Sequence, residues 1–265
     1  MVWSIWITYL HLDMIKLLNI LKEIQGKPKA IFMVGGAGSG KDYIYKKFIK
    51  PLGLEEINVD TSYKELLKTA NLGLKIADFT QDQLSQASKL MGQAQKATKE
   101  KYTQLSTAKN NIVINGTGAA NKPLLKKKQE LEALGYDTMM VMIWVSPYTS
   151  LERNATRERT LPPAIILRTW YGVNKNIETY RSAFGEDFVL INNDPKAELE
   201  FDPEYVEATF FQTVKGSGKT YSPEELVKKK QEIDALNQEI SNLLKAASDF
   251  TTMEDAKSKI NNFLK

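Results

Sequence analysis

Five short segments with strand character alternate with longer amphipathic segments over most of the chain. These segments cover residues 30–34, 56–59, 111–114, 138–145 and 188–191; 30–34 is an uninterrupted apolar run and 138–145 is strongly apolar. A continuous apolar run bounded by polar or glycine-rich residues is typical of a strand in a parallel sheet that is covered on both faces. The pattern therefore predicts a mostly parallel five-stranded sheet.

The segments between these runs carry apolar residues at helical spacing and end at proline or glycine. Helices are predicted at 14–25, from Lys41 to the Pro51-Leu52-Gly53 break, at 62–77, 80–108 and 122–134, from about 150 to the break at 161–163, and at 164–183. This alternation of strands and helices predicts an α/β fold in three layers, in which ligands bind above the carboxyl ends of the strands.

The pattern changes at about residue 222, where apolar residues begin to repeat every seven positions. This charged helix is predicted to run to about 247, and a shorter helix follows at 253–264; the repeating positions are Leu226, Ile233 and Ile240, with Leu236 and Leu243 between them. Such a segment forms either a helical hairpin docked on the main domain or a short coil that makes a homo-oligomer. We expect three parts: an N-terminal leader and helix at 1–27, the main domain at 28–215, and a C-terminal helical extension at 216–265.

Composition disfavours several kinds of chemistry. The 265 residues include no cysteine and one histidine, His11, which argues against disulfides, thiolate metal sites and histidine triads. The 36 basic and 32 acidic residues leave a net charge of +4, too small to indicate nucleic-acid binding by itself. Residues 1–12 are apolar but too few to span a bilayer, and they lack signal-peptide features, so we expect a cytoplasmic protein without a membrane partner.

The turn after the first strand carries the strongest chemical signal. Gly35 and Gly40 are separated by four residues and followed by Lys41, the spacing of a phosphate-binding loop. Glycines let backbone N–H groups surround phosphate oxygens, and the lysine ammonium bridges the β- and γ-phosphates of a nucleoside triphosphate. The predicted nucleotide-binding residues are Gly36, Gly38, Ser39, Gly40, Lys41 and Asp42.

Asp42 occupies the position where such loops usually have serine or threonine. A hydroxyl there ligates Mg²⁺, and a carboxylate serves the same ion directly or through water, because hard cations prefer oxygen ligands. We therefore predict Mg²⁺ as a cofactor, with Asp42 as its protein ligand and Asp60 near it.

Polar residues at the ends of the second and third strands predict the acceptor side of the site. Asp60 is placed to deprotonate an acceptor hydroxyl, or alternatively to cap the helix that follows. Asn115 and Thr117 are predicted to bind substrate beside it. The lysine run Lys122, Lys126, Lys127 and Lys128 either guides a polyanionic substrate or forms a solvated helix face.

An arginine cluster predicts a lid over about 150–170. Arg153 and Arg157 are four residues apart and share a helix face, with Arg159 close by. Guanidinium groups stabilise the negative charge that phosphoryl transfer spreads over the phosphate oxygens. The alternative is a surface helix in which Arg157 and Arg159 pair with Glu152 and Glu158.

Together these residues resemble the zeta-toxin-like P-loop kinases, which are close to polynucleotide kinases. The resemblance spans roughly 28–195 and rests on the segments 35–41, 111–118, 134–137 and 150–153, together with Asp60 and Arg157. It implies a three-layer P-loop kinase fold. It also implies that Asp60 is the catalytic base and that Arg153 and Arg157 hold the nucleotide phosphates, with Arg159 as a possible substitute.

Three departures from the toxins concern the acceptor and the metal. The toxins usually have an acidic residue where this chain has Asn115, they follow the catalytic aspartate with an aromatic-arginine pair and a His-Pro, and they have Ser/Thr at position 42. The Gly-Lys-Asp variant is similar to that of phage-encoded members, which would place the protein in a host cytoplasm.

The sequence thus predicts a kinase that uses ATP, with GTP as an open alternative, and Mg²⁺. Its predicted catalytic residues are Lys41, Asp60, Arg153 and Arg157. The γ-phosphoryl group would pass to a hydroxyl of a nucleotide-like or nucleic-acid substrate, either a 5′-hydroxyl or a modified base. The alternatives are a nucleotide-sugar kinase of the zeta-toxin type and a P-loop NTPase or nucleotide-binding assembly protein.

Overall fold

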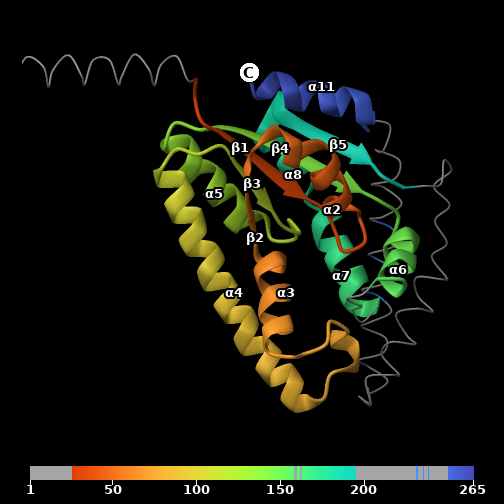
Figure 1. The fold of residues 1–265 in the computed structure, drawn as a ribbon. Coiled ribbons are helices and arrows are strands. Elements are labelled where there is room, and N and C mark those ends of the chain that lie inside the picture. Colours follow the sequence, from red (N-terminus) through yellow and green to blue (C-terminus); the bar gives the residue numbers. More distant parts are fainter. Residues whose placement is uncertain are drawn as a thin grey trace, which may run out of the picture.

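The computed structural model describes residues 26–157, 160–161, 163–194 and 250–265, together with Gln231, Ala235 and Gln238. The strands are β1 (Lys29–Val34), β2 (Glu55–Asn58), β3 (Ile112–Asn115), β4 (Asp137–Trp144) and β5 (Phe188–Asn192). The α-helices are α2 (Lys41–Ile44), α3 (Val59–Thr69), α4 (Gln81–Thr107), α5 (Asn121–Ala133), α6 (Pro147–Ala155), α7 (Pro163–Asn174), α8 (Ile177–Phe184) and α11 (Met253–Phe263), as labelled in Figure 1. Short turns of other helix types are η1 (Tyr45–Ile49), η2 (Lys50–Leu52), η3 (Ile76–Asp78) and η4 (Gly185–Asp187).

Within the described ranges the five strands form one parallel sheet in the order β2-β3-β1-β4-β5. The central strand is β1, and the chain leaves it for the β2 edge before returning through β3 and crossing to β4 and β5. Connections therefore run to opposite sides of β1, and its carboxyl end lies at a switch point where α/β sheets bind ligands. The predicted α/β fold with a parallel sheet is confirmed.

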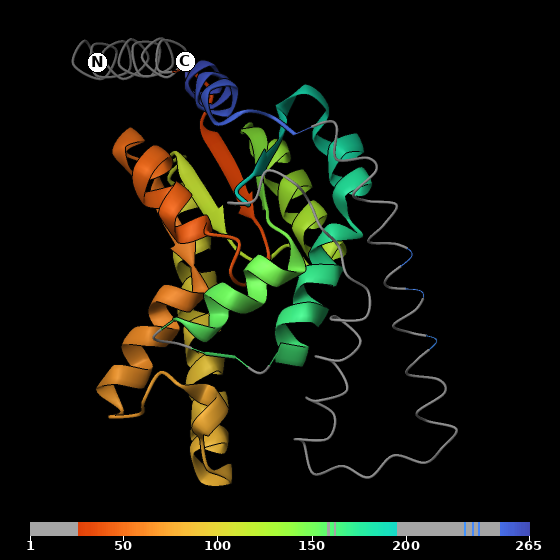
Figure 2. The same ribbon diagram turned by 90° about the vertical axis from the view of Figure 1, so that its right-hand side faces the viewer.

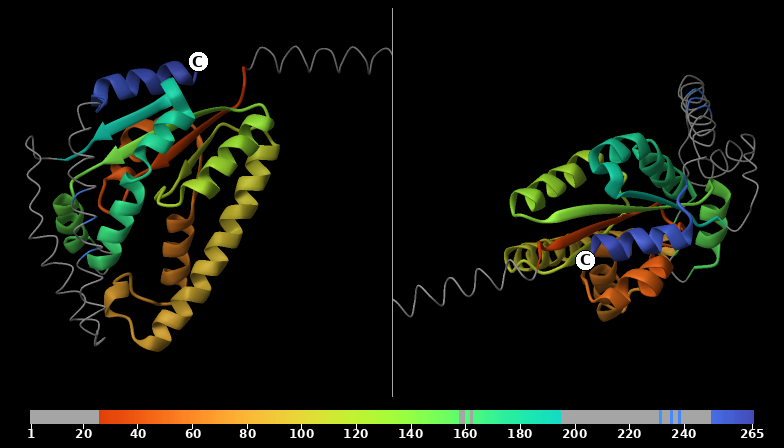
Figure 3. Two further views of the ribbon diagram at one scale, coloured as in Figure 1. Left: turned by 180° about the vertical axis from the view of Figure 1, so that it is seen from behind. Right: turned by 90° about the horizontal axis from the view of Figure 1, so that it is seen from above.

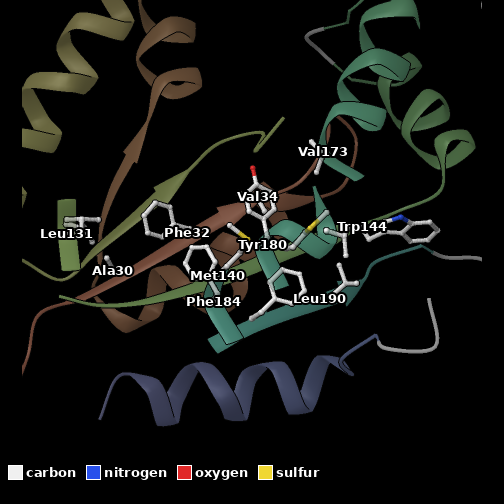
Figure 4. Close-up of a cluster of buried hydrophobic side chains, with 14 of the residues drawn as sticks. Ala30, Phe32, Val34, Leu131, Met140, Trp144, Val173, Tyr180, Phe184 and Leu190 are labelled. Atoms are coloured by element: carbon white, nitrogen blue, oxygen red, sulfur yellow. The ribbon is translucent and has the colours of Figure 1, made fainter. Parts of the chain in front are cut away.

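Alternate residues of each strand face two different helix layers, which gives the expected three-layer arrangement (Figure 3). On β1, Phe32 faces the layer of α5, α7 and α8, while Met33 faces the layer of α2, η1 and α11. Figure 4 shows the first of these two clusters, with Phe32 and Tyr180 among the labelled side chains. Both faces of the central strands are buried, which explains why β1 and β4 appear in the sequence as continuous apolar runs, whereas the edge strand β2 does not.

Helices α3 and α4 lie side by side and project from the β2 edge of the sheet (Figures 1 and 2). They are held together by a small apolar cluster of their own, separate from the two that cover the sheet, in which Tyr63, Leu67 and Ala94 are buried. The α4 helix begins with a capping box between Thr80 and Gln83. We call α3 and α4 the helical arm.

Several element boundaries differ from the sequence prediction. The helix predicted at 62–77 is α3, which begins at Val59 and ends at Thr69. The helix predicted at 164–183 is divided into α7 and α8, because Asn176 lies between them and its side-chain amide donates to the carbonyl oxygens of Gly172 and Ala119. These bonds tie the break to the loop after β3.

The last helix, α11, packs on the sheet through Ala256 and Ile260. Just before it, Thr251 donates a backbone hydrogen bond to Leu190 of β5. Residues 1–25 of the leader and helix predicted at 1–27 lie outside the described residues, as does the seven-residue repeat apart from three isolated positions. The domain boundaries near 27 and 215 therefore stay predictions. Among the residues that the structure describes, no helix has the length and apolarity needed to cross a membrane.

Candidate active site

A cleft of about 430 Å³ lies at the carboxyl ends of the strands. It is bounded by the loop after β1, the first turns of α3, the loop after β3, and helices α6 and α7. Its lining residues are Gly36, Ala37, Gly38, Ser39, Gly40, Lys41, Asp42, Asn58, Asp60, Lys64, Asn115, Gly116, Thr117, Arg153, Thr156, Arg157, Leu161 and Thr169. The cleft therefore brings together residues from four separate parts of the sequence.

The loop after β1 has the backbone conformation that its glycines predict. Gly38 and Gly40 have φ angles of 81° and 84°, in the left-handed region that favours glycine. A Cβ atom at Gly38 would lie 2.7 Å from the carbonyl oxygen of Ser150 in α6. Helix α2 starts directly after Gly40, so its amino terminus faces the cleft and favours a bound anion.

Lys41 lies at the base of this loop. Its ammonium group donates to the carbonyl oxygens of Gly35, at 2.5 Å, and Gly36, at 3.3 Å. Burial lowers the pKa of Lys41 to about 8, against the opposing influence of the Asp42 and Asp60 carboxylates; Arg157 lowers it further. Lys41, which is predicted to bind the nucleotide phosphates, is therefore close enough to interact electrostatically with Asp42, Asp60 and Arg157 around the cleft.

Arg153 and Asn193 hold the loop from the side of α6 and β5. The Arg153 guanidinium donates to the carbonyl oxygens of Gly38 (3.1 Å) and Asn193 (3.0 Å). The Asn193 side-chain amide donates to the carbonyl oxygen of Ser39 (2.8 Å). Arg153 therefore lies at the cleft as predicted, and its terminal nitrogens also support the phosphate loop.

Asp60 is in the first turn of α3 rather than at the end of β2. The helix is capped by Asn58, whose side-chain oxygen accepts from the backbone N–H of Asp60 at 2.9 Å. The capping role that we considered for Asp60 thus belongs to Asn58. The exposed Asp60 carboxylate lines the cleft, opposite the phosphate loop.

Lys64 was not recognised from the sequence, although it lines the cleft one helical turn after Asp60. Residues four apart lie on the same helix face, so the spacing from Asp60 would have indicated it once α3 was known to start at Val59. Asn58 and Glu56 were also missed; their roles depend on contacts between β2 and β3 that the sequence does not display.

The loop after β3 supplies Asn115 and Thr117 to the cleft, as predicted. Asn115 is buried, and its side-chain amide donates to Glu56 at 2.9 Å. Thr117 is exposed, and its carbonyl oxygen accepts from the backbone N–H of Gly35. This bond joins the loop after β3 to the phosphate loop.

Arg157 lines the cleft, whereas Arg159 lies outside the described residues. The lysine run of α5 is not part of the cleft lining: Lys126 and Lys128 pair with Glu130 and Glu132, and Lys127 lies over the ring of Tyr102. Lys126, with a side chain 77% exposed, fits the solvated-face interpretation, whereas the Lys128 side chain is 15% exposed and lies over the ring of Phe184.

The donor atoms near the loop fit a magnesium ion that is held mainly by phosphate and water. Asp42 is exposed in the first turn of α2 and contributes a carboxylate to the cleft. No cluster of three or more acidic, histidine or cysteine side chains suited to a metal occurs in the described part of the chain. Mg²⁺ ordinarily takes one or two carboxylates together with substrate phosphates and water, so one Asp42 suffices.

The fold and its phosphate loop define the chain as a P-loop kinase. The model of the zeta toxin family matches residues 16–199, well over half of the sequence, and the chain belongs to this family. The resemblance inferred from the sequence is thereby confirmed, while a phage origin stays a prediction. No curated protein matches the chain.

Several solved structures are similar at low identity. The PezAT toxin–antitoxin system of Streptococcus pneumoniae shares 18% identity, covers 86% of this chain and 93% of that one, and has a TM-score of 0.43. AvrRxo1-ORF1:-ORF2 with ATP shares 16%, with 74% and 78% covered and a TM-score of 0.47. A putative kinase from Chloroflexus aurantiacus shares 13%, with 73% and 98% covered and a TM-score of 0.44. At these values the family assignment rests on the family model alone.

Proposed function

We propose that the protein transfers the γ-phosphoryl group of ATP to a hydroxyl of a nucleotide-like or nucleic-acid substrate, with Mg²⁺ as cofactor. The observation that carries the proposal is the single cleft that phosphate-loop residues share with Asp60, Arg153 and Arg157. A protein that only binds a nucleotide needs the phosphate-loop residues but does not need Asp60, Arg153 and Arg157 beside them.

Each residue has a role in the proposed reaction. Lys41 and the loop amides hold the β- and γ-phosphates, and Arg157 faces the charge that develops on the transferred group. The oxygen of the acceptor hydroxyl bonds to the γ-phosphorus, and Asp60 accepts the proton of that hydroxyl. The bond between the γ-phosphorus and the β–γ bridging oxygen breaks, and ADP leaves. Bound Mg²⁺, with Asp42 as its ligand, would neutralise phosphate charge.

The acceptor side of the cleft favours a substrate that carries an anionic group. Lys64 is one helical turn beyond Asp60 on α3, and among the described residues it makes no ion pair. A cation one helical turn from the proposed base is suited to bind a phosphate group next to the reacting hydroxyl. Nucleotides, nucleotide sugars and nucleic-acid ends all meet this requirement.

A transfer screen with γ-³²P-ATP tests the proposal. The acceptors should be nucleoside monophosphates, DNA and RNA with free 5′-hydroxyls or modified bases, and nucleotide sugars. We expect labelled product from the native protein and a loss of at least about 100-fold in turnover for Asp60→Asn, with ATP affinity retained. A fully active Asp60→Asn protein would exclude Asp60 as the base.

The screen also separates the alternatives. Family membership favours the nucleotide-sugar kinase, and selective labelling of a nucleotide sugar would support it. The loss of the acidic residue at position 115 argues against that acceptor. ATP hydrolysis without transfer to any acceptor would instead support the NTPase alternative, in which nucleotide hydrolysis drives homo-oligomeric assembly through the C-terminal helices.

A further inference from the structure

Glu56 lies behind the cleft and contacts two residues that line it. Asn58 and Asn115 are partners in the register between β2 and β3, and Glu56 precedes Asn58 by two residues, on the same face of β2. The side-chain amide nitrogens of Asn58 and Asn115 both donate to the same carboxylate oxygen of Glu56, each at 2.9 Å. Glu56 itself does not line the cleft.

The chemistry of these bonds fixes how the two amides are turned. An ionised carboxylate only accepts hydrogen bonds, so each asparagine must present its nitrogen to Glu56. The oxygen of Asn58 then accepts from the backbone of Asp60. The oxygen of Asn115 is on the other side of its amide, where it is suited to accept a hydrogen bond from a hydroxyl.

Glu56 also interacts with the element that follows the phosphate loop. Tyr45, the first residue of η1 after α2, lies near Glu56: burial first, and then the Glu56 carboxylate, raises the pKa of its hydroxyl. One carboxylate thus accepts hydrogen bonds from residues of β2 and β3, and through Asn58 it reaches the start of α3.

We propose that Glu56 is a positioning residue that sets the orientation of Asn115 toward the acceptor and, through Asn58, the position of Asp60. This inference rests on the proposed kinase reaction for its functional consequence. A tilt of the first turn of α3 moves the Asp60 carboxylate. If the Asn115 amide turns over, its NH₂ group takes the place of the oxygen that would accept a hydrogen bond from the substrate hydroxyl. Glu56 therefore acts on acceptor use and leaves nucleotide binding to the phosphate loop.

Two substitutions at Glu56 separate geometry from charge. Because one oxygen accepts both amides, Glu56→Gln can keep both bonds, whereas Glu56→Leu removes the acceptor at similar volume. The matched control is Glu55→Leu, at the exposed neighbouring position of β2. The first readout is the side-chain amide NMR signals of Asn58 and Asn115, whose protons exchange slowly while they are hydrogen-bonded.

We expect the two slow amide signals in the native, Glu56→Gln and Glu55→Leu proteins and their loss in Glu56→Leu. With the best acceptor of the screen, Glu56→Leu should lower kcat/KM for the acceptor by about tenfold or more and leave the Kd for ATP within about twofold. Glu56→Gln should recover most of that loss.

Slow amide signals that persist in Glu56→Leu would overturn the proposal, as would an equal loss of acceptor use and ATP affinity. If the native protein labels no acceptor, the proposed function fails. The NMR comparison then still decides whether Glu56 orients the two asparagines.

Discussion

Burial and the neighbouring carboxylates shift the pKa of Lys41 in opposite directions. Burial lowers its pKa from 10.5 to about 8, although two carboxylates favour the charged form. The unfolded chain therefore binds more protons than the folded protein between about pH 8 and 10.5, and the contribution of Lys41 to stability increases as the pH rises through this window. Below about pH 8 the Lys41 ammonium is charged and buried, which lowers the stability of the folded protein, and the phosphates of bound ATP would offset this loss.

This balance predicts how ATP affinity depends on pH. If ATP requires the ammonium form, binding should weaken by about tenfold between pH 7 and pH 9, since about a tenth of Lys41 remains protonated at one unit above its pKa. Calorimetric titration across this range measures the effect. In Lys41→Arg the dependence should disappear, because arginine stays charged; an equally steep profile in that variant would assign the titration to another group.

The cation at Lys64 should affect the acceptor and not ATP. We expect Lys64→Ala to raise KM for a phosphate-bearing acceptor by about tenfold, the loss of one charge-assisted contact, with an unchanged Kd for ATP. Lys68→Ala, one turn further along α3 at an exposed position outside the cleft, is the control. Steady-state kinetics on both variants would contradict the role if they behaved alike.

At the scale of elements, the phosphate loop depends on its close approach to α6. In Gly38→Ala the new Cβ would meet the backbone of Ser150 at 2.7 Å and the left-handed φ would be strained, so both the loop and α6 must move. Gly53→Ala is a matched control, because Gly53 has a φ of 76° and open space around it. ATP affinity should fall by more than about tenfold in Gly38→Ala only, as measured by titration, since displaced loop amides no longer meet the phosphates. Comparable ATP affinity in the two variants would refute the importance of this contact.

The elements that the sequence predicts well are those fixed by local patterns. The strands β1 and β4 are continuous apolar runs because both faces of the sheet are covered there, and the glycine spacing by itself identifies the loop. The start of α3 was missed because Asn58 caps it through its side chain, four residues before Ser62, where a helix was predicted to begin. The break at Asn176 was missed because its bonds reach a loop more than fifty residues earlier.

The candidate site shows the same division between local and tertiary information. Lys41, Asp60 and Arg153 follow from motifs and strand ends. The support that Asn193 gives to the loop, and the link from Glu56 to Asn115, depend on strand order, which a single sequence does not display. Cleft residues that belong to a sequence motif were therefore easier to predict than the residues that hold them in place.

At the scale of the whole molecule, α11 limits how the oligomer alternative for the C-terminal repeat can be tested. A deletion of 222–265 would remove the seven-residue repeat together with α11, whose Ala256 and Ile260 are buried against the sheet. Substitution of Leu226, Ile233 and Ile240 by asparagine leaves α11 intact. If the repeat forms a homo-oligomer, sedimentation should show a smaller species in this variant with ATP affinity retained; an unchanged mass would contradict that role.

The packing of α11 also predicts how the end of the chain contributes to stability. Ile260 is 2% exposed and belongs to the same apolar cluster as Ile44 of the phosphate-loop helix. Ile260→Ala should lower the free energy of unfolding by about 2–4 kcal/mol, the usual cost of truncating a buried isoleucine, while the exposed Lys259→Ala should change it by less than about 0.5 kcal/mol. Denaturant unfolding of both variants measures the difference. Equal stability of the two variants would mean that α11 does not pack there.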